Sequence, residues 1–87
     1  MKNIEMRRIK WLCRRGMLEL DTLLTPFCEN NFDSLSYKEK ILFIEVLKMD
    51  DNILYNILIK NYKCPNHLSY IISKIKDFYF KYKKKLV

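Results

Sequence analysis

The chain has 87 residues, with 17 lysine and arginine residues against 10 aspartate and glutamate residues, which gives a net charge of +7. Its single glycine excludes the glycine-rich phosphate-binding loops of nucleotide-binding folds and disfavours an array of tight β-hairpins, whose turns prefer Gly and Asn. Because 49% of the residues are hydrophobic and 14% are aromatic, we exclude a disordered chain and predict a small all-α domain.

The spacing of apolar residues predicts the first two helices over residues 4–14 and 17–30. Gly16 lies between them, directly after two arginines that suit a helix C-terminus, and we expect it to adopt the left-handed conformation of a helix cap. Pro26 removes a backbone donor from the second helix, so a kink or a restart is expected there. Residues 31–35 are predicted to form a loop.

A capping box opens the third predicted helix, with Ser36 as the N-cap and Glu39 three residues later. Asp50 or Asp51 can cap a fourth helix. Pro65 is expected to be an early residue of the fifth helix, which carries the clearest amphipathic stripe. The three predicted ranges are 36–48, 50–61 and 65–82. We therefore predict a compact five-helix single domain of the all-α class over residues 1–87.

The positive charge is concentrated at the two ends of the chain. Residues 1–15 hold six cations and one anion, residues 16–56 three cations and eight anions, and residues 57–87 eight cations and one anion. A basic cluster such as Lys81–Lys85 can bind phosphate groups, so a small basic nucleic-acid-binding or antitoxin-like regulatory module is one alternative. A purely structural helical subunit is another. Lysines also complement the dipole at a helix C-terminus, and we expect residues 81–87 to be a frayed basic tail without specific nucleic-acid binding.

The cysteines do not form a recognisable site. Cys13, Cys28 and Cys64 are widely separated, and only Cys64-x-x-His67 brings two potential zinc ligands close together. Structural zinc sites usually supply their ligands as close pairs, so we predict no metal site and no catalytic Cys–His pair. Three unpaired cysteines suit reduced thiols in the cytoplasm. No apolar run reaches 18 residues, so membrane insertion is not expected.

The densest cluster of functional residue types is the segment W-L-C-R-R-G-M-L-E-L-D at residues 11–21. Arginine and tryptophan are enriched at interface anchors, and a glycine lets another chain approach the backbone closely. Arg15 and Glu19 are four residues apart and can pair across the bend. The segment is either a protein-binding site or only a capped corner between two helices, and its composition favours the binding site.

This segment resembles the marker of the succinate dehydrogenase flavinylation factors, a family of small FAD-assembly factors. The family's R-G-x-x-E pattern is matched by residues 15–19, with Arg8 and Trp11 upstream. The resemblance continues through F-D-S-L-S at residues 32–36 and covers residues 7–80.

The resemblance implies a five-helix factor that binds the flavoprotein subunit of succinate dehydrogenase, with that of fumarate reductase as a second client. It also implies that the factor promotes covalent attachment of FAD to a histidine of this subunit. The bond-forming chemistry would belong to the flavoprotein, so we expect a non-catalytic monomer of the bacterial cytoplasm that binds no FAD stably itself. Arg15, Gly16 and Glu19 match the marker. The predicted partner-binding set adds their neighbours Arg8, Trp11, Arg14, Met17 and Asp21.

Overall fold

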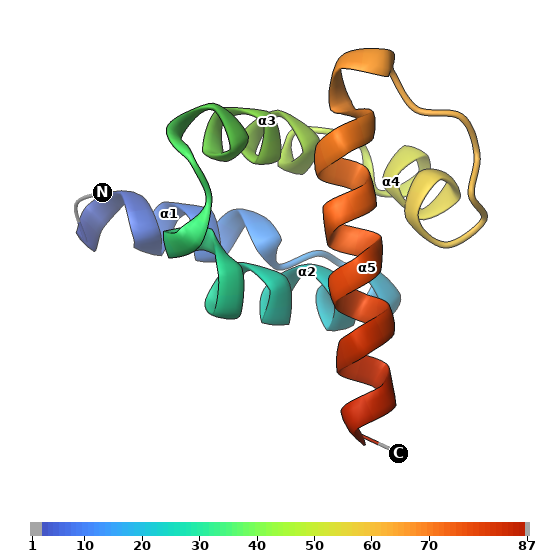
Figure 1. The fold of residues 1–87 in the computed structure, drawn as a ribbon, viewed down its shortest axis with the longest axis horizontal. Coiled ribbons are helices and arrows are strands. Elements are labelled where there is room, and N and C mark those ends of the chain that lie inside the picture. Colours follow the sequence, from blue (N-terminus) through green and yellow to red (C-terminus); the bar gives the residue numbers. More distant parts are fainter. Residues whose placement is uncertain (1–2, 87) are drawn as a thin grey trace.

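Apolar residues three and four positions apart form five α-helices, joined in part by two short 3-10 turns (Figure 1). The computed structural model describes the backbone of residues 3–86 and the side chains of residues 7–81. In chain order the elements are α1 (Asn3–Cys13), α2 (Leu18–Asn31), η1 (Phe32–Ser34), α3 (Tyr37–Leu47), α4 (Asp51–Leu58), η2 (Asn66–Leu68) and α5 (Ser69–Leu86). No strand occurs within residues 3–86, so the predicted all-α, five-helix class is confirmed.

The last helix stands across the others. In Figure 1, α2 runs back below α1 after the turn between them, α3 lies above this pair, and α5 crosses in front. α1 packs mainly against α2, while α5 packs against both α2 and α3. The turn between α1 and α2 remains at the surface, where Gly16 is exposed.

The core is apolar and centred on aromatic rings. The ring of Phe27 lies 5.2 Å from that of Phe43 and 5.6 Å from that of Phe78, and Phe32 lies 6.1 Å from Phe43, centroid to centroid. Such tilted and edge-on contacts add to the free energy gained by burying the rings. Among the described residues no polar or charged residue is buried, and the buried set includes the two free thiols of Cys13 and Cys28.

Two of the predicted helix caps are confirmed. The Ser36 hydroxyl accepts from the Glu39 N–H at 3.1 Å, and the Ser36 N–H donates to the Glu39 carboxylate at 2.8 Å, which completes the capping box. Asp50 caps α4 by accepting from the Asn52 N–H at 3.1 Å. Helix α2 continues through Pro26 as a single element without a restart.

Other helix ends differ from the prediction. Helix α4 stops at Leu58, and Asn61 adopts a left-handed backbone with a φ of 60°, a conformation that asparagine tolerates better than most residues. Pro65 is extended, with a ψ of 139°, and precedes η2, so it is not an early residue of α5. The backbone of α5 is helical through Leu86, so the helix covers residues 81–86 of the predicted tail. Of that tail, only the side chain of Lys81 lies within the described residues.

A salt bridge joins α3 to α5. The Lys74 ammonium donates to the Glu39 carboxylate at 2.9 Å. The hydrogen bond from the Ser36 N–H, together with the contact from Lys74, lowers the pKa of Glu39 from 4.5 to about 2. Because the pKa of the folded state lies below the ordinary value, the charged carboxylate stabilises the fold above pH 4.5, and this contribution is lost as the pH falls towards 2.

The substitution Glu39→Gln is expected to flatten the acid side of the stability profile, because glutamine keeps the capping hydrogen bond but has no proton to gain. Circular dichroism melts at about pH 6 and about pH 3 should show a smaller drop in melting temperature for this variant than for the wild type. Glu29→Gln removes an exposed α2 carboxylate and should behave like the wild type. Equal drops for Glu39→Gln and the wild type would contradict the expected role of this charge.

Candidate partner-binding surface

The face of α1 that points away from the core carries tryptophan and arginine. Ile9 and Cys13, four residues apart, are buried in the core. Trp11 is 71% exposed, and Arg8, which shares its side of the helix three residues earlier, is exposed too. Arg14 follows the end of α1 and is also exposed. An indole left in water beside two cations is not explained by packing of the core.

Gly16 is not required by the local backbone. Its φ is not positive, so the predicted left-handed cap is wrong. Met17, extended with a φ of −104° and a ψ of 119°, is the N-cap of α2 and lets the chain reverse without a left-handed residue. A Cβ added at Gly16 would meet nothing within 4 Å. The fold itself would therefore accept a side chain here.

Arg15 turns inward, whereas its neighbours Arg14 and Gly16 are exposed. The Arg15 side chain is only 14% exposed. Its guanidinium donates to the Leu47 carbonyl, to the Met49 carbonyl at 3.3 Å and to the Asp51 carboxylate at 3.4 Å. The side chain therefore links the α1–α2 turn to the end of α3 and the start of α4.

The anticipated pairing of Arg15 with Glu19 is absent. Arg15 pairs instead with Asp51, and Glu19 is exposed with no ion-pair partner among the side chains of residues 7–81. Asp21 is half-buried and accepts a hydrogen bond from the Arg15 backbone N–H. Met17 is half-buried, and its carbonyl accepts from the Asp21 N–H at 3.1 Å. Arg15, Met17 and Asp21 thus brace the turn from within.

The structure divides the predicted set into two groups. Arg15, Met17 and Asp21 are half-buried and contact the rest of the fold. The other five are exposed on α1, on the turn or at the start of α2: Arg8, Trp11, Arg14, Gly16 and Glu19.

Sequence reasoning missed one residue of this surface. Leu18 is the first residue of α2 and is 74% exposed. The sequence could have predicted this exposure, because Leu18 does not belong to the apolar stripe of α2 formed by Leu20, Leu24 and Phe27. With Trp11, it places a second large apolar side chain in water close to Gly16 in the sequence.

Other potential chemistry is sparse in the described part of the chain. The three cysteines are free thiols, and no group of three potential metal ligands occurs among these residues. A hydrogen bond with the Cys28 thiol and burial both raise the pKa of Cys13, which keeps that thiol neutral. None of the described helices combines the length and apolar character needed to cross a membrane.

The geometry defines a small helical domain whose exposed charged and aromatic side chains flank one braced turn. The model of the family described as flavinator of succinate dehydrogenase matches residues 7–79. The chain belongs to this family of flavinylation assembly factors.

Individual relatives support the same assignment. A protein of Wigglesworthia glossinidia brevipalpis named FAD assembly factor SdhE is 47% identical over 75 residues, which is 85% of this chain and 89% of the relative. Proteins of the same name from Vibrio cholerae and Shewanella oneidensis are 45% and 41% identical over 69 and 66 residues. These alignments cover 78% and 76% of this chain and 80% of each relative.

Replacing Arg15 by alanine should destabilise the fold by about 1–3 kcal/mol, because the carbonyls of Leu47 and Met49 lose a donor in a partly buried place. Arg14→Ala, an exposed change one residue away, should stay within about 0.5 kcal/mol of the wild type. Urea unfolding followed by circular dichroism measures both free energies. Equal stability of the two variants would show that the inward contacts of Arg15 contribute nothing.

Proposed function

We propose that the chain binds the flavoprotein subunit of succinate dehydrogenase and promotes the covalent attachment of FAD to it without itself being an enzyme. The flavoprotein of fumarate reductase is a second client in this proposal. The observation that carries it is the exposed glycine at position 16, which neither the backbone conformation nor the packing of this chain demands. A glycine that the fold does not need is explained by a partner that approaches the backbone closely.

The side chains around this glycine suit a protein partner. Trp11 and Leu18 offer large apolar surface that is in water in the free chain, and such anchors supply much of the binding free energy at interfaces. Arg8, Arg14 and Glu19 are exposed charges that can fix the orientation of the client. The family name supports the client class, because it refers to succinate dehydrogenase.

In this proposal FAD is carried by the client and not by the factor. Two open clefts of about 500 and 340 Å³ lie in the described part of the chain. Neither is lined by Gly16, and the glycine-rich turn that usually holds a dinucleotide is impossible with one glycine. The factor would act as a monomer in the cytoplasm, where free thiols such as Cys13 and Cys28 persist.

The mechanism would then be a shift of the client's conformational equilibrium. A factor that binds the attachment-competent conformation more tightly than the others raises its population. The exposed residues of the surface would make the contacts, while Arg15 would act as a positioning residue that holds the turn in place. Glu19, with no ion-pair partner in residues 7–81, would offer its charge to the client.

The substitution Gly16→Leu should preserve the fold and block client binding. The backbone conformation is ordinary, and a Cβ at this exposed position meets nothing within 4 Å, so the far-UV spectrum and the melting temperature should stay near those of the wild type. Affinity for the purified flavoprotein subunit, measured by calorimetry, should fall at least about tenfold. Gly16→Ala, which adds only a methyl group at the same position, should lose less affinity for the subunit than Gly16→Leu.

Covalent flavin, read as fluorescence on a denaturing gel, should fall in parallel with the affinity of each Gly16 variant. Wild-type flavin attachment with Gly16→Leu would refute the proposed close approach.

Glu19→Ala is expected to weaken client binding by roughly 2–5 kcal/mol, because the partner group would be left buried and unpaired. Glu29→Ala removes an exposed carboxylate from the same helix and serves as the matched control. Calorimetry with the flavoprotein subunit should separate the two variants, while their melting temperatures stay alike. If Glu19→Ala binds as tightly as Glu29→Ala, Glu19 is not a contact.

A further inference from the structure

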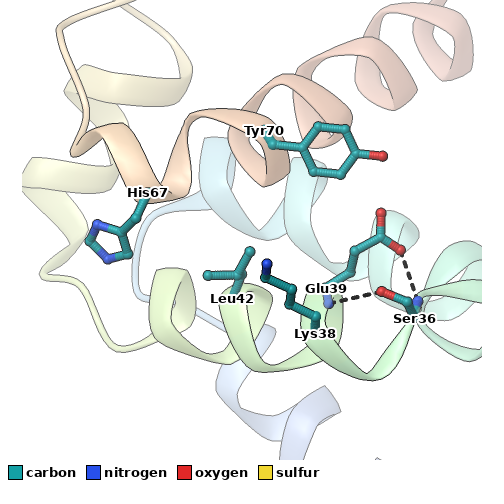
Figure 2. Close-up of a pocket in the computed structure, with 6 residues that line it drawn as sticks. All are labelled: Ser36, Lys38, Glu39, Leu42, His67 and Tyr70. Carbon is teal, nitrogen blue, oxygen red and sulfur yellow. Dashed lines mark hydrogen bonds between the residues drawn. The ribbon is translucent and has the colours of Figure 1, made fainter.

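A cleft of about 500 Å³ lies between the N-terminal half of α3 and the start of α5, away from the Gly16 turn. Its lining residues are Ser36, Lys38, Glu39, Leu42, His67 and Tyr70. Figure 2 shows the Lys38 side chain beside Leu42, below the Tyr70 ring. His67 lies at the end of the cleft opposite Ser36. The cleft thus combines one extended cation with an aliphatic floor and an aromatic wall.

Glu39 is the only carboxylate among the six lining residues, and it has partners: it accepts from the Ser36 N–H and the Lys74 ammonium. Outside the lining, the Glu45 carboxylate contacts the His67 ring, which carries a charge only when it is protonated. Lys38 forms no hydrogen bond or ion pair with any of the side chains of residues 7–81. Among the lining residues, the charge left without a partner is therefore the Lys38 ammonium.

One exposed apolar side chain of α3 lies beside the cleft without lining it. Ile41 is 48% exposed and, three residues after Lys38, lies on the same side of the helix as that lysine. Tyr70, on the other wall, is 59% exposed. Tyrosine is enriched in protein-binding surfaces because its ring supplies contact area and its hydroxyl a hydrogen bond. Ile41 therefore extends the contact area beyond the cleft itself.

We propose that this cleft is a second docking site, which takes an acidic peptide segment with an apolar neighbour from a partner protein. The acidic side chain would pair with the Lys38 ammonium. The apolar neighbour would lie on Leu42 against the Tyr70 ring, and the rest of the segment would cover Ile41. A free small acid would pair with Lys38 but leave Ile41 and much of the Tyr70 ring in water, which favours a peptide.

The site is separate from the Gly16 surface. Arg15 ties the α1–α2 turn to the carbonyl of Leu47 at the C-terminal end of α3, whereas Lys38 lies in the first turn of that helix. Nine residues of α-helix separate Lys38 from Leu47, a rise of about 13 Å. The proposal for this second site therefore does not depend on the identity of the client proposed for the Gly16 surface.

The test is a titration of the ¹⁵N-labelled full chain with two capped tetrapeptides, acetyl-Leu-Asp-Glu-Leu-amide and its neutral analogue acetyl-Leu-Asn-Gln-Leu-amide. The acidic peptide should shift the backbone amide signals of Leu42, His67 and Tyr70 and bind at least about fivefold more tightly than the analogue. Lys38→Gln should weaken the acidic peptide about two- to fivefold, as expected for an exposed ion pair. Lys63→Gln, a matched exposed lysine outside the cleft, should have no effect.

Tyr70→Ala should weaken both peptides, because it removes the aromatic wall that they share. Equal binding of the two peptides, or signals that shift only at residues 11–19, would overturn the proposal. The same shifts with glutarate at equal concentration would also overturn it, because the occupant would then be a small acid. Shifts that appear on concentrating the free chain would instead identify a second copy as the occupant and refute the peptide.

Discussion

The inward guanidinium of Arg15 is the contact on which the geometry of the candidate surface depends. It reaches the Leu47 and Met49 carbonyls and the Asp51 carboxylate, so one side chain connects the α1–α2 turn to the α3–α4 turn. The Leu47 carbonyl belongs to the last turn of α3, where carbonyls lack partners within the helix. The several N–H donors of an arginine fork can satisfy such groups together, which a lysine does less well. The turn that carries Gly16 is therefore anchored to the body of the domain.

This anchoring gives adjacent residues opposite roles. Arg15 is directed into the molecule, Gly16 exposes its backbone, and Leu18 and Glu19 project into water from the first turn of α2. A surface presented on a braced turn loses less conformational freedom on binding than one on a flexible loop, so more of its contact energy remains as affinity. Asp21 adds to this rigidity from the other side, since its carboxylate holds the Arg15 backbone N–H.

Sequence patterns within a few residues of one another correctly predicted helix caps. The capping box of Ser36 and Glu39 depends on residues three apart, and its hydrogen bonds are formed as expected. The Arg15 contacts could not be predicted, because its partners are 32 to 36 residues away and only the packing of α3 and α4 brings them near. The left-handed assignment of Gly16 failed for a related reason. Glycine permits that conformation without requiring it, and the extended residue that follows achieves the reversal.

The apolar interior limits how this chain could assist a partner. No charged or polar residue is buried among those described, so the free energy that the factor can supply must come from its surface. A ligand shifts a conformational equilibrium only by its differential affinity for the two states, and a tenfold change in population needs about 1.4 kcal/mol. A single desolvated tryptophan or charge pair at an interface can exceed that amount. In the proposed function, contacts of Trp11 and Glu19 with the client would together supply enough free energy to change its preferred conformation.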